Sequence, residues 1–462
     1  MTEHIDLQKN SIGKTLFQYA VPSTMAVWIF ALYTMVDGMF VGKGVGADAL
    51  AAVNLSMPYI SIMFAISILV TIGAATVAGA KKGAGKHNDA SRIFSSTIYA
   101  LFIFGASVCA LSYFFIEEIV WMLGARGHMI PLVKEYLQTL LIFNTFYLVA
   151  YSMEVFVKVD GFPKRELMAI CCAALTNVLL DYVLVIQLDM GLRGAAIATG
   201  CAQMLQGILL LLHFFGRFKA KGTLKFVKVL PSFKEILRFV KIGLPDCITE
   251  MSAGLILLAF NNAILAYLST TELTAFSVIG YANNLMLLTM IGLTQGMQPI
   301  VTFLRGKQDF AGISKVVWLT TKAAFVICTF SYAGIFLFGD VLASLFLNDS
   351  GLIALSHSLM KTFCLAFIFM GLNVVTSGFF TALEQPVYAG AISLMRGGVL
   401  VLILLVVLPA FMGPKGIWYV APLSEIIAFV ISFIMIWRKI GLWKQPSFAL
   451  HSFTTNLLIN LK

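Results

Sequence analysis

Long apolar runs alternate with short polar breaks along almost the whole chain. Between breaks that are charged or rich in proline and glycine, each run is about 20 residues or longer, the length an α-helix needs to cross the core of a bilayer. The pattern predicts twelve membrane-spanning helices, at residues 15–41, 50–79, 92–116, 133–157, 166–187, 193–216, 236–267, 273–304, 315–338, 353–383, 387–411 and 417–437.

Composition agrees with a protein whose surface lies largely in lipid. Hydrophobic residues make up 60% of the 462 residues and charged residues 12%, whereas a soluble domain carries about 25% charged residues. These values exclude a soluble enzyme and a disordered chain. The sequence also lacks the strings of a nucleotide-binding loop or of a catalytic triad. We therefore expect an all-α membrane protein that is not an enzyme and is not driven by ATP.

Lysine and arginine are divided unequally between the two sides of this arrangement. Alternate loops, together with both termini, hold 24 of the 32 Lys and Arg on one side, and the other loops hold five. Basic residues accumulate in the cytoplasmic loops of membrane proteins. We expect a multi-pass protein of the cell membrane with both termini in the cytoplasm. The net charge of +10 then reports topology, and we expect no nucleic-acid partner.

The two halves of the chain repeat one another. A shift of 223 residues, or of 222 near the end of each half, superposes prolines and glycines in order: Pro22 on Pro245, Gly73 on Gly296, Gly83 on Gly306, Pro163 on Pro386, Gly191 on Gly413 and Gly194 on Gly416. Six spans per half make the repeats parallel, an architecture found in transporters. We predict an N-terminal six-helix lobe at 1–216, a cytoplasmic linker at 217–241, a C-terminal six-helix lobe at 242–440 and a cytoplasmic tail at 441–462.

Acidic residues within the first-half spans mark a candidate ion site. Counted at about 1.5 Å per residue, Asp37 and Asp181 lie roughly 7 and 10 Å below the outer ends of the first and fifth helices, and Thr199 roughly 9 Å below that of the sixth. Asn177 shares a helical face with Asp181. An oxygen-rich cluster of these side chains suits Na⁺, or a proton shared by two acids. The alternative is a polar cluster that only holds helices together.

The second half distributes its charges differently. Arg396 and Glu425 lie near the midplane, where they could form an ion pair or take part in substrate binding. Glu250 lies near the same depth, and a carboxylate facing a cavity there would attract a cationic ligand.

Three further acids are predicted to lie closer to the cytoplasmic side. Asp246 and Glu384 are expected at cytoplasmic helix ends, as solvated caps or gates. Glu154 could be neutralised by Lys158, one helical turn later.

Several strings occur together in these duplicated halves: Pro22 to Asp37 continuing to Gly42, Asp160 to Lys164, Asn177 with Asp181, Gly191 to Thr199, and Gln295 to Pro299. Over about residues 10–440 the chain resembles the multidrug and toxic compound extrusion (MATE) family of twelve-helix secondary antiporters. The resemblance implies that organic cations leave the cell as Na⁺ or H⁺ enters, with no cofactor besides that ion.

The resemblance also implies roles for single residues. In the bacterial and archaeal branch of the family, the coupling cation binds a set of side chains that match Asp37, Asn177, Asp181 and Thr199. The proline at which the family's first helix bends matches Pro22, and an acid of the seventh helix in another branch is similar in kind to Glu250. We expect substrate binding or gating to involve Glu250, Arg396, Glu425 and Pro22.

Two other classes of function remain to be weighed. An exporter of lipid-linked sugars or another metabolite would belong to the same superfamily, but it usually needs basic cavity residues for pyrophosphate, and Arg396 is the clearest base near the midplane. A membrane enzyme or channel finds no supporting motif. We expect a monomer in the lipid bilayer that transports small organic cations.

Overall fold

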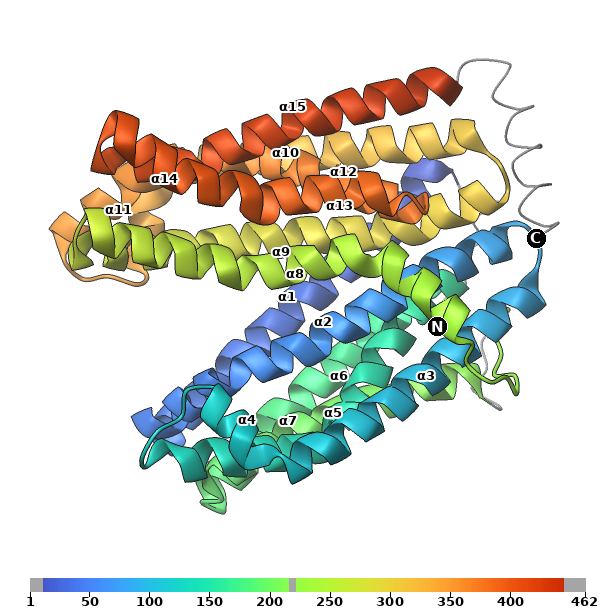
Figure 1. Ribbon diagram of the computed structural model, residues 1–462, viewed down its shortest axis with the longest axis horizontal. Helices are drawn as coiled ribbons and strands as arrows, with labels where there is room; N and C mark the ends of the chain where they lie inside the picture. Colours follow the sequence, from blue (N-terminus) through green and yellow to red (C-terminus); the bar gives the residue numbers. More distant parts are fainter. Residues whose placement is uncertain (1–10, 216–221, 444–462) are drawn as a thin grey trace.

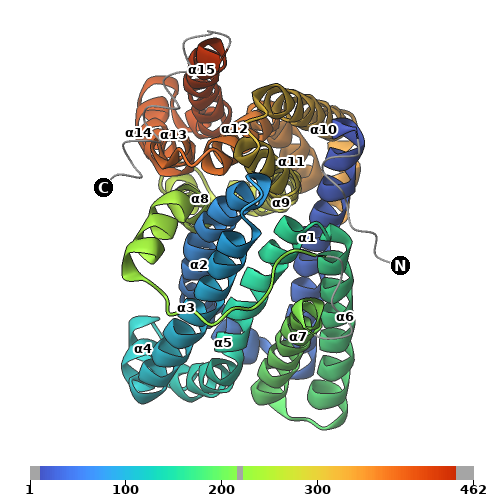
Figure 2. The ribbon, with the colours of Figure 1, turned by 90° about the vertical axis from the view of Figure 1, so that its right-hand side faces the viewer.

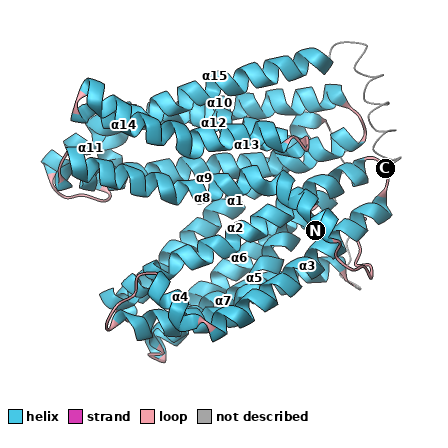
Figure 3. Cartoon of the chain, viewed as in Figure 1, coloured by secondary structure: helices cyan, strands magenta, loops and turns pink. Residues whose placement is uncertain are grey.

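The computed structural model describes residues 11–215 and 222–443, and within these ranges the chain consists of helices joined by short loops (Figure 3). The first half contains α1 (Ile12–Gly44), α2 (Ala47–Gly83), α3 (His87–Phe114), α4 (Ile116–Met122), α5 (Met129–Asp160), α6 (Pro163–Asp181), η1 (Tyr182–Gln187) and α7 (Gly191–Phe214). The second half contains α8 (Phe233–Tyr267), α9 (Thr270–Gly306), α10 (Phe310–Ser344), α11 (Ser350–Phe363), α12 (Ala366–Ala382), α13 (Pro386–Leu394), η3 (Met395–Val399), α14 (Leu400–Met412), η4 (Pro414–Gly416) and α15 (Ile417–Trp443).

The prediction of a twelve-helix membrane protein is confirmed. In the described ranges, eleven helical segments are long and apolar enough to cross a membrane, and α11 with α12 forms a twelfth span that is bent by 47°. This bent pair is the predicted segment 353–383. Neither proline nor glycine stands at the break between Phe363 and Ala366, so the hydrophobic pattern runs through it without a sign of the bend.

The two halves form two bundles, α1–α7 and α8–α15 (Figures 1 and 2). In Figure 1 the bundles converge at the end where α1 begins and α15 ends, and they diverge toward the opposite end. Where they converge, α2 packs against α8 and α9, and α1 packs against α9. The first turns of α1 even belong to the core of the second bundle, since Leu16 and Tyr19 are buried in the same cluster as Met297 and Ile300.

Glycines allow α2 and α8 to touch backbone to backbone in this region. A β-carbon on Gly73 of α2 would lie 1.9 Å from the carbonyl oxygen of Phe239, and one on Gly243 of α8 would lie 2.0 Å from that of Leu69. Both distances are far shorter than atoms tolerate, so a residue with a side chain would push the helices apart.

Glycines also allow close backbone contact between α2 and α9, and these glycines occupy equivalent positions in the two halves of the repeat. A β-carbon on Gly83 would lie 1.9 Å from the carbonyl oxygen of Phe303, and one on Gly306 would lie 1.9 Å from that of Ala80. Residues 80 and 303, like 83 and 306, are related by the shift of 223 found in the sequence. We call these four close approaches, at Gly73, Gly243, Gly83 and Gly306, the glycine seam.

The connection between the bundles is held against the first bundle. The backbone N–H groups of Lys225 and Val227 donate to Ser91 Oγ (3.2 Å) and Ser95 Oγ (2.9 Å) on α3. Helix α8 begins at Phe233, so the last part of the expected linker is helical; residues 444–462 of the expected tail lie outside the described residues.

We expect Gly73→Ala to destabilise the protein by about 1–3 kcal/mol, the usual cost of overpacking, because α2 and α8 must separate to admit the methyl group. The temperature at which the purified protein unfolds in detergent measures this. Gly334→Ala in α10 is the control, since its β-carbon would meet no atom within 4 Å and alanine favours a helix by about 1 kcal/mol. Equal unfolding temperatures for wild type and Gly73→Ala would contradict the packing described.

Candidate functional site

Four polar side chains gather inside the first bundle, in the half away from the glycine seam. Thr199 Oγ1 on α7 donates a hydrogen bond to Asp37 Oδ1 on α1 at 3.2 Å, and Asn177 Nδ2 on α6 donates to Thr199 Oγ1 at 3.5 Å. Asp181 lies one turn after Asn177, close enough to Asp37 for their carboxyl groups to interact. Asn177 and Asp181 are fully buried and Asp37 is 8% exposed. We call these four residues the acidic cluster.

The acidic cluster is short of hydrogen-bond donors. Both oxygens of Asp181, and Oδ1 of Asn177, have no partner among the described residues. Two neighbouring carboxylates in a buried site repel each other unless a proton or a cation compensates their charge. Carboxylate, amide and hydroxyl oxygens are also the ligands that hard cations prefer. The arrangement therefore fits Na⁺ or H⁺; elsewhere in the described residues, no three His, Cys, Asp or Glu side chains gather as metal ligands.

Helix α6 changes its winding directly after Asp181, where it continues as the π-helix η1. Short π-helical segments are rare, and they are frequent at functional sites. The corresponding helix of the second bundle has the same feature in η3, which carries Arg396. Both segments interrupt the regular hydrogen-bond ladder of a membrane helix beside a charged side chain.

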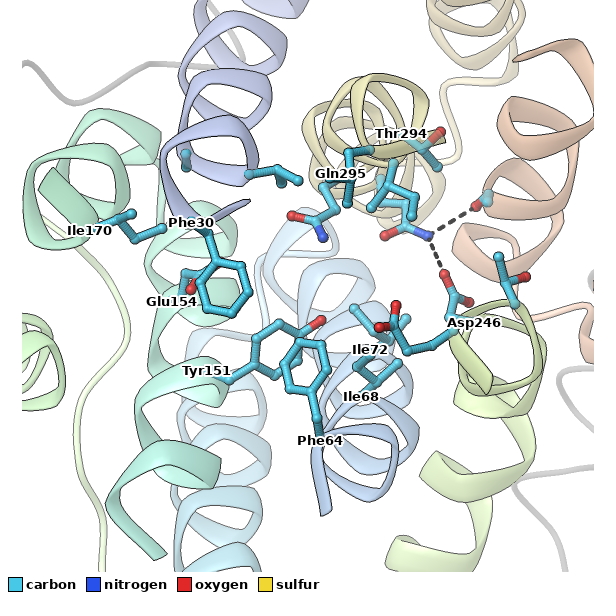
Figure 4. Close-up of a pocket in the computed structure, with 18 of the residues that line it drawn as sticks. Phe30, Phe64, Ile68, Ile72, Tyr151, Glu154, Ile170, Asp246, Thr294 and Gln295 are labelled. Atoms are coloured by element: carbon cyan, nitrogen blue, oxygen red, sulfur yellow. Dashed lines mark hydrogen bonds between the residues drawn. The ribbon is translucent and has the colours of Figure 1, made fainter. Parts of the chain in front are cut away.

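A second candidate site is a cavity of about 170 Å³ between the two bundles (Figure 4). Part of its wall is aromatic and comes from the first bundle: Phe30, Phe64, Tyr147 and Tyr151. The rings of Phe64 and Tyr151 meet edge to face with their centroids 4.9 Å apart. Aromatic faces attract organic cations. We call this space the central cavity.

Carboxylates from both bundles also line the central cavity. Gln206 Nε2 donates to Glu154 Oε2 at 3.1 Å, and Thr381 Oγ1 donates to Asp246 Oδ2 at 2.9 Å. Glu250 lines the cavity without a hydrogen bond or ion pair to any described residue. Neither Lys nor Arg is among the described residues that form this wall, so the cavity carries an excess of negative charge.

The position of Asp246 corrects the sequence prediction of a solvated cytoplasmic cap. Because α8 begins at Phe233, Asp246 lies roughly 20 Å along the helix, at about 1.5 Å per residue. The predicted span already began at residue 236, three residues after the start of α8, so the error concerns the surroundings of the side chain: Asp246 lines the central cavity, where Thr381 and Gln298 donate to it.

Lys158 supplies a buried positive charge beside the central cavity. Its Nζ lies 2.7 Å from Glu166 Oε1 and 3.9 Å from Glu154 Oε1, so two acids share one ammonium group. Lys158 Nζ also donates to Gln295 Oε1 on α9 at 2.9 Å, which joins the two bundles. The hydrophobic pattern does not reveal Glu166 as a buried residue, because it follows two basic residues at the predicted helix start.

The sequence allows Arg396 and Glu425 either to form an ion pair or to take part in substrate binding. In the structure they form an ion pair, with Arg396 Nη2 3.1 Å from Glu425 Oε1. Asn373 Nδ2 donates to Glu425 Oε2 at 2.7 Å. The pair lines a cavity within the second bundle, whereas Glu250 lines the central cavity. Similar depth therefore does not bring Glu250 to this pair, because the side chains leave their helices in different directions.

Two remaining candidates lie apart from both sites. Pro22 is buried within α1, which runs without interruption from Ile12 to Gly44. Glu384, for which a solvated cap or a gate is expected, is an ion-paired residue between α12 and α13, with Arg238 Nη2 at 2.6 Å and Arg305 Nη1 at 2.8 Å, so the prediction of a solvated cap is wrong. Burial would raise the pKa of Glu384, but the guanidinium groups of Arg305 and Arg238 hold it below its ordinary value.

The MatE family model matches residues 22–183 and 247–407, once in each half. The multidrug export protein MepA of Staphylococcus saprophyticus is 22% identical over 437 residues, 93% of this chain and 94% of that protein. MepA of Staphylococcus aureus strain NCTC 8325 is 20% identical over 433 residues, with the same coverage of 93% and 94%.

Solved structures share the fold at low sequence identity. An outward-facing multidrug resistance MATE family transporter of the MOP superfamily has a TM-score of 0.88 at 18% identity, over 96% of this chain and 98% of its own. A MOP superfamily transporter from Pyrococcus furiosus, for which a reversed polarity of the binding pocket is reported, has a TM-score of 0.87 at 18% identity, over 96% and 99%.

We expect Lys158→Met to destabilise the protein by about 3–5 kcal/mol, because it leaves Glu166 and Glu154 buried without a cation. Thermal unfolding in detergent measures the loss. Lys81→Met is the matched control: its ion pair with Asp89 is exposed and should contribute less than about 1 kcal/mol. Comparable losses for the two variants would contradict the buried role of Lys158.

Proposed function

This chain belongs to the MatE family of multidrug efflux transporters, and from that premise we propose that it is a secondary antiporter that exports organic cations in exchange for Na⁺ or H⁺. We place it as a monomer in the cell membrane with both termini in the cytoplasm, in keeping with the unequal distribution of Lys and Arg. It needs no cofactor beyond the coupling ion. The end at which the bundles converge is then the cytoplasmic end, and the bundles diverge toward the outside (Figure 1).

The proposed substrate class rests on the composition of the wall of the central cavity. Three carboxylates and four aromatic rings line it, without a Lys or Arg among its described lining residues. An organic cation would be attracted electrostatically by the carboxylates, and its apolar part would pack against the aromatic rings. This wall does not suit the pyrophosphate of a lipid-linked sugar, the alternative substrate class, because Lys158 is already shared by Glu154 and Glu166.

We propose the acidic cluster as the site of the coupling ion. A proton or Na⁺ that binds between Asp37 and Asp181 relieves their repulsion, so the loaded and empty states of the cluster differ in free energy. Coupling requires that this ion bind one arrangement of the bundles more tightly than the other, since equal affinity shifts no equilibrium.

Helix α1 is the element through which the ion acts on substrate. It carries Asp37 in the acidic cluster, Phe30 on the wall of the central cavity and Leu16 in the core of the second bundle. We propose that ion binding at Asp37 changes the shape of α1 near Pro22, where a proline removes one helical hydrogen bond. A change there alters the cavity wall and the contact between the bundles together.

We expect Asp37→Asn and Asp181→Asn each to abolish ion-driven transport while the protein still inserts, because neither variant can hold the ion with two carboxylates. Uptake of ethidium into inside-out vesicles measures transport, and separate Na⁺ and pH jumps identify the coupling ion. Glu117→Gln is the control, since Glu117 is an exposed acid outside the spans that pairs with Lys134. Wild-type transport rates for either aspartate variant would remove the acidic cluster from the mechanism.

We expect Glu250→Gln to weaken the binding of tetraphenylphosphonium about tenfold, or ~1.4 kcal/mol, because Glu250 is the carboxylate of the central cavity without a partner. Equilibrium dialysis with the purified protein measures the dissociation constant. Asp246→Asn should have a smaller effect, since that carboxylate already accepts from Thr381 and Gln298. The reverse order of the two effects would contradict the assignment.

A further inference from the structure

The second bundle contains a cavity of its own, of about 570 Å³. It is lined by α8, α9, the junction of α11 with α12, η3, α14 and α15, and it is separate from the central cavity, with which it shares only Thr249. Its volume lies within the range of about 300–1,000 Å³ that is usual for pockets that hold small organic ligands. We call it the C-lobe cavity.

Two of the four positions of the acidic cluster have their repeat-related counterparts in the wall of the C-lobe cavity. The shift of 223 places Asp37 on Phe260, and the shift of 222 places Thr199 on Ala421. Phe260 and Ala421 both line the C-lobe cavity. At these two positions the second bundle has an aromatic ring and a methyl group where the first bundle has a carboxylate and a hydroxyl.

The charged groups that the C-lobe cavity does contain cancel each other. Glu425 has both oxygens occupied, one by Arg396 Nη2 and one by Asn373 Nδ2. Arg396 is 8% exposed, and its Nε has no partner among the described residues. The pair is therefore neutral as a whole, its acceptors are used, and a buried guanidinium donor is left over, which normally requires a partner.

Three asparagines complete the polar wall: Asn261 on α8, and Asn283 and Asn284 on α9. None of their side-chain amides forms a hydrogen bond with a described residue, although Asn261 and Asn283 are half-buried. Each amide offers two donors and one acceptor. Phe260, Phe276 and Met370 supply an apolar surface beside them.

We propose that the C-lobe cavity is a second ligand site, which binds uncharged organic molecules that carry carbonyl, hydroxyl or amide groups. Arg396 and the asparagine amides pair with those groups, and the aromatic rings pack against the rest of the ligand. A cation is disfavoured, because the cavity has a guanidinium group and its one carboxylate is neutralised. The protein then has two sites of different chemistry, and this one does not depend on the coupling ion.

Chloramphenicol, which is uncharged and carries one amide and two hydroxyl groups, is the probe, and tetraphenylphosphonium is the cationic reference. We expect the double variant Asn283→Leu, Asn284→Leu to weaken chloramphenicol binding about tenfold or more, since two hydrogen bonds to the ligand are lost. Binding of tetraphenylphosphonium should stay within about twofold of wild type. Equilibrium dialysis with the purified full-length protein gives both dissociation constants.

Two further variants separate this site from the central cavity. A β-carbon on Gly280, in the wall of the C-lobe cavity, would meet no atom within 4 Å. The side chain of Gly280→Leu therefore starts in open space, and by occupying the cavity it should also prevent chloramphenicol binding. Glu250→Gln should weaken only tetraphenylphosphonium.

The binding measurements can contradict the second ligand site without contradicting the proposed antiport function. Absence of saturable chloramphenicol binding, unchanged affinity in both C-lobe variants, or competition by tetraphenylphosphonium for a single shared site would overturn the second site. Whether the central cavity binds cations is tested separately, by tetraphenylphosphonium binding to wild type and to Glu250→Gln.

Discussion

Burial of two carboxyl groups without a matching base is the constraint on which the rest of the structure depends. Asp37 and Asp181 lie in a low-dielectric interior, and the Asp181 oxygens have no donor among the described residues. Such a site is stable only while a proton or a cation accompanies it. Its charge state therefore depends on the solution it faces, which is the property an ion-coupled carrier requires.

In the proposed mechanism, the charge state of the acidic cluster acts on the opposite end of the molecule through packed helices rather than through a chain of ion pairs. Helix α1 runs uninterrupted from the core of the second bundle to the acidic cluster. The glycine seam holds α2 against α8 and α9 by direct backbone contact. Such contacts are either made or broken, because a helix backbone offers little room for gradual adjustment. An interface of this kind is compatible with the two arrangements of the bundles that the proposed antiport mechanism requires.

Much of this architecture can be predicted from the sequence, and the failures have physical causes. Span length, charge asymmetry and the 223-residue repeat predict the twelve helices and two halves, because lipid imposes all-helical spans. Depth arithmetic brings Asp37 and Asp181 to one level, but it carries no information about the direction of a side chain. That limit explains why similar depth does not bring Glu250 to Arg396, and why the sequence does not reveal that Asp246 lines a cavity between the two bundles.

Duplication of a six-helix unit gives two bundles with similar interiors, and the two interiors differ in the charged residues that they contain. The acidic cluster of the first holds Asp37 and Asp181 without a hydrogen-bond donor to Asp181 among the described residues, as the proposed coupling-ion site requires. The second keeps Arg396 with Glu425, a pair that stays neutral and held by Asn373. In the proposed mechanism, a second pair of acids at the repeat-related position would bind the coupling ion as well, and α1 would no longer be the single element that responds to it. The neutral pair of Arg396 and Glu425 is consistent with ion binding in one lobe of a nearly symmetric fold.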